Sequence, residues 1–359
     1  MKKNIFVLSL VLASLSVTLI YILYLFSNDP HKERYSFTRI LIPEAISELD
    51  NFNLGYNSYY IAGCTKHHIY FGNFTAPFKI LVSNSNLKDT IHRRIQVKNR
   101  KNYKFRAIQV KVDSPNFYIT DGTVPVIMKG TTTGWQAGRY MYDSTHFTLS
   151  LPVSSNSFAV RSINSETMEY LLGKINADTP HFKLMPNLLE KQIDGIFCTD
   201  GMLQYNREIS RLVYVYYYRN QYIVMDTALN LKYRSNTIDP INHAQIKVAH
   251  ITSKSSTKMS APPLVVNKHC SIYKKWLFVH SNLLSKNESI ELFNKASVID
   301  VYDLEQGKYK FSFYLRDYNK KKLDDFQIYN DKLIAIYDRY AVTYALSIDN
   351  LDNQISKSN

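Results

Sequence analysis

Short runs rich in Val, Ile, Tyr and Phe recur along the chain and constrain the fold more than any other feature. Polar or turn-forming residues separate each run from the next, which is typical of strands in a meandering antiparallel sheet. The clearest series lies near the end of the chain. Four runs there are followed by three more, at 264–267, 276–281, 297–304 and 310–315, then 326–329, 333–337 and 341–348. This series predicts one complete four-stranded unit and a second unit that lacks one strand.

Four similar groups of runs precede this series. They lie at 58–63, 68–74, 78–83 and 90–97; at 107–112, 116–122, 124–130 and 137–142; at 146–153, 157–163, 167–173 and 181–185; and at 195–205, 211–219, 222–229 and either 231–234 or 244–251. Units that recur every ~40–60 residues are typical of propeller blades, which are four-stranded sheets set around a central channel. The sequence therefore predicts an all-β, six-bladed β-propeller.

The incomplete last unit needs a fourth strand, and one spare run is available before the first unit. We expect residues 35–42 to pair into the sixth blade and close the ring, which removes an open sheet edge. Residues 43–50 are polar, with one helical turn expected at 44–49. A β-sandwich followed by a second all-β domain is the competing fold. No linker rich in Pro, Gly or Ser divides the chain, which counts against two domains.

Residues 5–26 form an uncharged apolar segment of the length that a membrane-spanning helix needs. Lys2 and Lys3 precede it and favour a cytoplasmic N-terminus. A cleaved signal peptide is the alternative, but the segment is long for one and no A-x-A site follows. The prediction is a single-pass inner-membrane protein whose C-terminal domain lies in the periplasm. The expected organisation is a signal anchor at 1–27, a tether and ring-closing strand at 28–54, the propeller at 55–350 and a polar tail at 351–359.

The chain has a net charge of +14, and much of the excess lies between residues 88 and 111. This segment could face anionic lipid headgroups, an acidic glycan or an acidic protein. The alternative is a solvated outer strand and its loop. Nucleic acid is not an expected partner of an exported domain. The chain has three cysteines, far apart in sequence, and we expect no disulfide framework.

Local motifs for catalysis or metal binding are absent from the sequence. His67 and His68 are adjacent, so on a strand they would point to opposite faces and could not easily share an ion. No HExxH, CxxC, GxSxG or phosphate-binding loop occurs. We therefore predict no metal and no cofactor and assign no catalytic residue. A metal site assembled from separate blades stays open.

Propellers usually bind ligands on the face formed by the loops that lead into each blade and the loops that join its second and third strands. The predicted loops place several cations there, which would suit an anionic partner. Asp121 could act as a ligand near the channel, or it could simply stabilise a turn. Trp135 could stack a ring on the same side, or it could pack inside a blade. The candidate ligand-binding residues are Arg106, Asp121, Trp135, Arg161, Arg219, Arg316 and Arg339, and the alternative for the arginines is ordinary surface charge.

The soluble part resembles the membrane-anchored, six-bladed TolB-like propellers of Bacteroidetes-type bacteria. The resemblance is carried by NSYYIAG…HIYFGN (57–73), DGIFCTDGML (194–203), APPLVVN (261–267) and the LIAIYD ending. It implies a propeller and leaves the activity open, because propellers host enzymes and scaffolds alike. We expect a binding or scaffolding module for a protein or an anionic envelope component. The alternative is a propeller enzyme, either a metal-dependent hydrolase or lactonase, or a dehydrogenase-like subunit.

Overall fold

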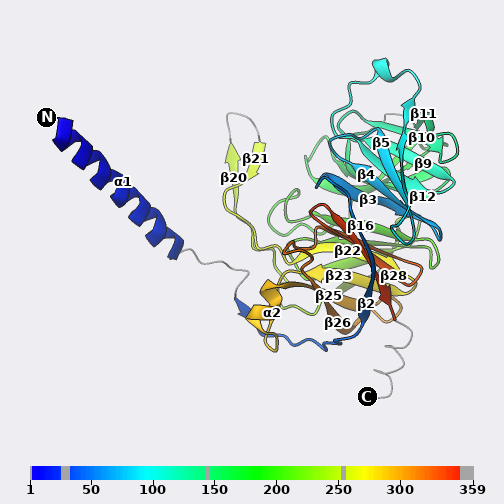
Figure 1. The fold of residues 1–359 in the computed structure, drawn as a ribbon. Helices are drawn as coiled ribbons and strands as arrows, with labels where there is room; N and C mark the ends of the chain where they lie inside the picture. Colours follow the sequence, from blue (N-terminus) through cyan, green and yellow to red (C-terminus); the bar gives the residue numbers. More distant parts are fainter. Residues whose placement is uncertain (1, 26–32, 142–144, 252–255, 348–359) are drawn as a thin grey trace.

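The computed structural model describes residues 2–25, 33–141, 145–251 and 256–347. One long helix, α1 (Lys2–Leu25), is followed by a body built almost entirely of strands (Figure 1). Within α1, residues Asn4–Leu23 are apolar and long enough to cross a membrane or to act as a signal sequence. The predicted tail 351–359 and residues 28–32 of the predicted tether lie outside the described residues.

The body is a six-bladed β-propeller, as the sequence predicted, and each blade contains four antiparallel strands. Blade 1 is β3 (Tyr59–Cys64), β4 (His68–Asn73), β5 (Lys79–Asn84) and β6 (Thr90–Arg94), and blade 2 is β8 (Gln109–Asp113), β9 (Asn116–Asp121), β10 (Val126–Thr131) and β11 (Gln136–Met141). Blade 3 is β12 (Phe147–Ser154), β13 (Ser157–Ile163), β14 (Tyr170–Asn176) and β15 (Phe182–Met185), and blade 4 is β16 (Gly201–Asn206), β17 (Arg211–Tyr216), β18 (Gln221–Met225) and β19 (Leu231–Asn236). Blade 5 is β22 (Asn267–Tyr273), β23 (Trp276–Ser281), β25 (Ala296–Asp303) and β26 (Lys308–Arg316), and blade 6 is β27 (Asp325–Tyr329), β28 (Lys332–Tyr337), β29 (Tyr340–Leu346) and β2 (Ile46–Asn53).

Smaller elements decorate the loops between these strands. Strand β7 (Gln96–Val97) adds to the outer edge of blade 2, and a short 3-10 helix (Arg100–Asn102) follows it. Strands β20 (Val248–Ile251) and β21 (Ser256–Met259) form a hairpin that projects from the propeller (Figure 1). Strand β24 (Leu284–Ser285) and helix α2 (Ile290–Asn294) lie in the long loop within blade 5.

The hydrophobic core lies between the blades. Six buried clusters each combine side chains from two neighbouring blades, and together they cover every junction around the ring. At the junction of blades 5 and 6, for example, Trp276 and Phe278 pack with Phe326 and Tyr337. The middle strands of a blade are therefore buried on both faces, which explains why runs such as 276–281 are apolar without alternation.

The ring closes through β2, which pairs antiparallel with β29 as the outermost strand of blade 6. The predicted closure by an N-terminal strand is correct in kind, but the predicted residues are wrong, because the closing strand is Ile46–Asn53 and not 35–42. The helical turn expected at 44–49 is also wrong, since Ile46 begins this strand.

Residues 35–42, expected to close the ring, pack on blade 5 instead. Strand β1 (Arg34–Tyr35) runs parallel to β24, and Leu41 forms a bridge with Ser312 on β26. Between these contacts, Phe37 and Arg39 are buried. This segment therefore connects α1 to the propeller by fixing the chain against blade 5.

Two other strand predictions need correction. The run 264–267 is not the first strand of blade 5, which begins only at Asn267; Leu264 and Val266 instead pack in a small cluster with Phe37. The fourth strand of blade 4 is β19, so of the two alternatives the run at 231–234 is correct. Residues 248–251 of the other run instead form β20, the first strand of the β20–β21 hairpin.

Gly63 permits close packing of the inner strands of blades 1 and 2. A Cβ atom at this position would lie 2.1 Å from the Val112 carbonyl oxygen. We expect Gly63→Ala to lower the free energy of unfolding by about 1–3 kcal/mol, because one strand must shift. Gly138→Ala is the matched control, since a Cβ there meets nothing within 4 Å. Chemical denaturation of both variants would measure this, and equal effects would contradict the packing argument.

Candidate functional site

The topology sorts the loops of the propeller onto two faces. Each blade runs antiparallel from its innermost to its outermost strand, and the chain then passes to the innermost strand of the next blade. The loops between blades and the loops joining second and third strands therefore lie on one face, here named the front face. The remaining turns form the back face.

Asp121 stabilises the front-face backbone of blade 2. Its carboxylate is fully buried and accepts hydrogen bonds from the backbone N–H groups of Arg106, Ala107, Thr123 and Val124. These bonds join the loop that leads into blade 2 to the turn after β9. The carboxylate oxygens are thus engaged within the blade, as the turn alternative predicted, while the Arg106 side chain is exposed.

Arg161 and Arg219 lie inside the protein and not on its surface. The Arg161 guanidinium pairs with Asp200 and donates to the Tyr214 hydroxyl at 3.0 Å, so it ties blade 3 to blade 4. Arg219 stacks 3.7 Å above the Tyr216 ring and donates to the backbone oxygen of Glu190. The structure does not bring either arginine together with Arg106.

The prediction that Trp135 lies beside the front loops is wrong. It lies in the turn between β10 and β11, which belongs to the back face. Its ring is buried and stacks on Phe117 with 5.1 Å between ring centroids. Trp135 is therefore a packing residue of blade 2, in agreement with the packing alternative.

Arg316 and Arg339 are exposed on the front face, on blades 5 and 6. The neighbouring lysines of the same face are partly neutralised, since Lys321 pairs with Asp338 at 3.1 Å and Lys322 with Asp317 at 3.2 Å. A continuous ring of free cations therefore does not form around the channel among the described residues.

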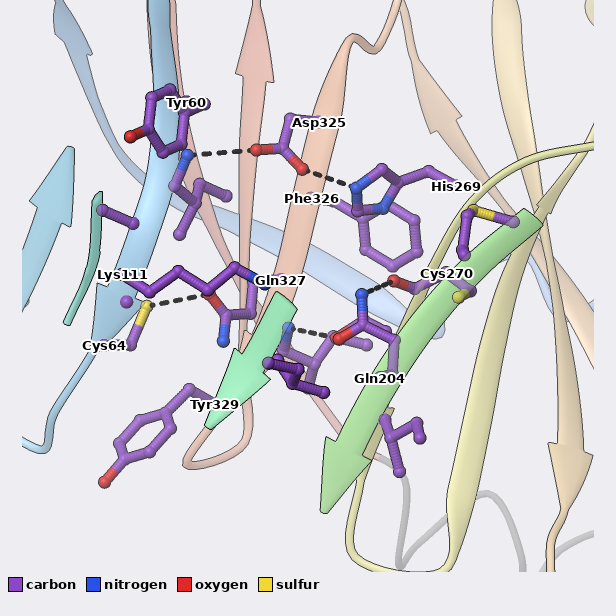
Figure 2. Close-up of a pocket in the computed structure, with 18 of the residues that line it drawn as sticks. Tyr60, Cys64, Lys111, Gln204, His269, Cys270, Asp325, Phe326, Gln327 and Tyr329 are labelled. Atoms are coloured by element: carbon purple, nitrogen blue, oxygen red, sulfur yellow. Dashed lines mark hydrogen bonds and ion pairs between the residues drawn. The ribbon is translucent and has the colours of Figure 1, made fainter. Parts of the chain in front are cut away.

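A central channel with a volume of about 940 Å³ lies between the innermost strands of the blades. The first strand of every blade contributes to its wall (Figure 2). On two of these strands, β8 and β27, fully buried side chains alternate with more exposed ones. The buried positions pack between blades and are Val110 and Val112 of β8 and Phe326 and Ile328 of β27. The polar residues that alternate with them, among them Lys111, face the channel.

An Asp–His pair lies on neighbouring inner strands of this channel. The Asp325 carboxylate is 2.8 Å from His269 Nε2, and it also accepts a hydrogen bond from the Ile61 N–H at 3.0 Å (Figure 2). Burial alone would raise the pKa of Asp325, but His269 and these hydrogen bonds outweigh it and lower that pKa. Asp325 therefore stays ionised and connects blade 6 to blades 5 and 1.

Lys111 faces the same channel from β8, and Figure 2 shows it beside Cys64 and Gln327. No ion pair or hydrogen bond of its ammonium group occurs among the described residues. Burial lowers the pKa of Lys111 to about 8, although the charge of Asp325 acts in the opposite direction. The channel thus holds an amine whose charge has no direct acceptor in the described part of the chain.

The lowered pKa of Lys111 predicts a specific pH dependence of the free energy of unfolding. Between pH 8 and the ordinary lysine pKa of 10.5, the unfolded chain keeps a proton that the folded chain has lost. The free energy of unfolding should therefore rise with pH across this window in the wild type but not in Lys111→Met. We expect a difference of about 1–2 kcal/mol, less than the full shift implies, because the channel admits water. Chemical denaturation at pH 8 and pH 10.5 measures this difference in the free energy of unfolding. Lys308→Met, at an exposed position, is the control. If the free energy of unfolding changed equally with pH in the wild type and in Lys111→Met, the prediction would be wrong.

Two cysteines complete the channel wall. The Cys64 thiol lies 3.7 Å from Gln327 Oε1, and the backbone oxygen of Cys270 accepts from Gln204 Nε2 at 3.0 Å. Burial raises the pKa of both thiols, so they stay protonated. All three cysteines of the chain are free. Among the described residues, no group of three or more His, Cys, Asp and Glu side chains is placed to hold a metal ion.

Sequence reasoning missed Lys111, His269 and Asp325. A signal for two of them was present, because QVKVD (109–113) and DFQIY (325–329) alternate polar and apolar residues. On the innermost strand of a blade, the polar positions of such a run must face the channel. His269 gives no comparable signal, since its strand does not alternate regularly.

Comparison with known proteins supports the fold and goes no further. No protein-family model matches the sequence. No curated protein matches it either. Among solved structures, a member of the DUF4221 family from Bacteroides vulgatus is similar with a TM-score of 0.53 and 12% identity, over 88% of this chain and 99% of that chain.

Two further structures resemble the chain more weakly. BamB from Moraxella catarrhalis has a TM-score of 0.43 and 8% identity, over 84% of this chain and 98% of that chain. YCF48, solved bound to D1 peptide, has a TM-score of 0.46 and 8% identity, over 89% of this chain and 100% of that chain.

Proposed function

We propose that the protein is a membrane-anchored, exported binding module that holds an envelope component, either a protein segment or an anionic molecule, in its central channel. The helix α1 anchors the chain, and the propeller lies in the periplasm. The observation that carries the proposal is the Lys111 ammonium group, which faces a cavity of about 940 Å³ without an acceptor among the described residues. A bound carboxylate or other anion would supply that acceptor and would stabilise the charged form of the amine.

The rest of the channel supports binding of this kind. Gln109, Gln204 and Gln327 offer amide donors and acceptors from three different blades. The strands that carry them are fixed by the buried clusters between blades, so the site is largely pre-formed. Such a wall suits an extended polar ligand more than a large apolar one.

Photo-crosslinking in intact cells tests the channel. A photoreactive residue in place of Gln109 should give a discrete adduct, and adding Lys111→Met should reduce its yield about tenfold or more, the loss expected for a charged hydrogen bond. The same residue in place of Lys88, on the back face, is the control. Equal adducts from both positions, or a yield unaffected by Lys111→Met, would remove the channel as the binding site.

Topology is tested separately. A reporter that is active only outside the cytoplasm, fused after Leu346, should be active, because Lys2 and Lys3 favour a cytoplasmic N-terminus. Activity of a cytoplasm-specific reporter at the same position would overturn the periplasmic placement.

The Asp325–His269 pair favours an enzyme as the second candidate. A carboxylate that orients an imidazole is a common arrangement for general acid–base chemistry, and Lys111 shares the channel. In that case the bound molecule would be turned over, and His269→Gln would abolish turnover while leaving crosslinking at Gln109 intact.

A further inference from the structure

We infer that the propeller docks on the anionic surface of its own membrane through its front face. The contact is made by the loop at residues 98–106, here named the basic loop, and by apolar side chains in other front-face loops. The basic loop runs from the outer edge of blade 2 to the innermost strand of that blade. This inference rests on the part of the proposed function in which α1 anchors the chain. It goes beyond that function by assigning a partner to a surface outside the channel.

The attachment point of the anchor orients the propeller. Strand β1 pairs with β24, which lies in the loop between the second and third strands of blade 5 and therefore on the front face. Only eight residues separate Leu25 from Arg34. They span at most about 32 Å when fully extended. The propeller is thus held near the bilayer by the front face.

The basic loop carries charge that the protein does not neutralise. Its five cations are exposed, it contains no acid, and none of them forms an ion pair in the described part of the chain: Lys98, Arg100, Lys101, Lys104 and Arg106. Elsewhere on this face, Lys321 and Lys322 have acidic partners. Beneath the loop, Arg100 lies 4.3 Å from the Phe78 ring centroid, and the Tyr103 and Phe105 rings stack at 5.6 Å. This packing holds the loop in place while its cations face outward.

Exposed large apolar side chains are more numerous on the front face than on the back face. Outside α1, five of the large apolar side chains that are most exposed lie in front-face loops: Tyr56, Phe74, Met168, Ile193 and Ile290. Three more, Ile40, Leu49 and Ile91, lie along the outer edges of blades. On the back face, the comparable side chains of the described residues are Leu231 and Tyr329, each at a strand end, so the front face is more apolar than the back face. Cations combined with protruding aromatic and aliphatic side chains suit the interface between lipid headgroups and acyl chains.

Weak contacts are sufficient for docking because the segment between α1 and the propeller is short. Each Lys or Arg near an anionic surface changes the docking equilibrium about fivefold, which corresponds to about 1 kcal/mol. Because α1 already holds the propeller at the bilayer, docking is intramolecular and needs no further encounter. In the docked arrangement the back-face mouth of the channel opens away from the membrane.

Full-length protein in vesicles tests the inference. An environment-sensitive probe is attached at Asn102→Cys in the basic loop or at Lys66→Cys on the back face, and vesicles carry nitroxide-labelled headgroups. We expect quenching of the Asn102 probe in vesicles with phosphatidylglycerol, weaker quenching in phosphatidylcholine alone or at high salt, and none at Lys66. Labelling of the wild type measures the background from the native cysteines.

Charge variants identify the surface. Lys98→Gln, Lys101→Gln and Lys104→Gln together should weaken docking more than tenfold, whereas Lys66→Gln, Lys88→Gln and Lys308→Gln on the back face should leave it unchanged. If the protein floats with the vesicles but the Asn102 probe is not quenched, or if both triple variants act alike, the docking inference is wrong. If the protein does not float with any vesicle, the anchor itself is wrong, and the proposed function fails at that step.

Discussion

Replacing Arg39 with methionine should lower the free energy of unfolding by about 3–5 kcal/mol, the cost of leaving buried charges without a partner. The Arg39 side chain is fully buried, and its guanidinium uses every donor. It donates to both oxygens of Asp300, at 2.7 and 3.1 Å, to Ser281 Oγ at 2.8 Å, to the Leu283 backbone oxygen at 2.9 Å and to Glu288. Burial opposes its charge, but Asp300 and Glu288 outweigh that effect and raise the pKa of Arg39.

Two comparisons isolate the cause of this effect. Arg316→Met, at an exposed position on the same blade, should change stability by less than about 0.5 kcal/mol. Combining Arg39→Met with Asp300→Asn and Glu288→Gln should recover part of the loss, because the unpaired carboxylates are then neutral. Urea denaturation of all three variants beside the wild type measures these differences. A stable Arg39→Met variant would show that the 33–42 segment does not contribute to folding.

The sequence predicted the blades because their strands are marked by apolar runs and polar turns. It placed the closing strand wrongly for a physical reason. The outermost strand of a blade has one face in solvent, and β2 is mostly exposed, so its sequence ISELDNFN lacks an apolar run. The segment 35–42 has such a run because Phe37 is buried in a cluster of loop residues and not in a blade.

The candidate site was less predictable, because its residues are brought together only by the ring. Asp325 and His269 are far apart in sequence and meet because β22 and β27 are neighbouring inner strands. A blade map drawn from the sequence places the loop arginines at the surface. Arg161 and Arg219 are buried instead because they bind acceptors on neighbouring segments, and such partners cannot be recognised from local sequence.

Replacing β2 with a Gly/Ser linker of equal length should destabilise the whole propeller, and we expect the largest effect of any change considered. Blade 6 would then end at β29, whose backbone groups and whose side chains Val342 and Leu346 depend on β2 for cover on that edge. An open edge of this kind also promotes association between molecules. Helix α1 and the Arg39 contacts stay in the chain, so the variant tests closure alone.

The matched control replaces residues 98–105, a segment of the same length outside the blades, with the same linker. That change removes Tyr103 and Phe105, which pack only partly buried against the junction of blades 1 and 2, and should lower the melting temperature by a few degrees. Loss of β2 should cost about 4 kcal/mol or more and lower the melting temperature by at least 10 °C. Thermal unfolding and size-exclusion chromatography measure stability and association together. If both replacements behaved alike, the ring would be stable without its closing strand, and the six junctions between blades would suffice to hold the propeller. If the β2 replacement alone lowered the melting temperature strongly, the strand contributed by the segment that follows α1 would be what makes the ring one cooperative unit.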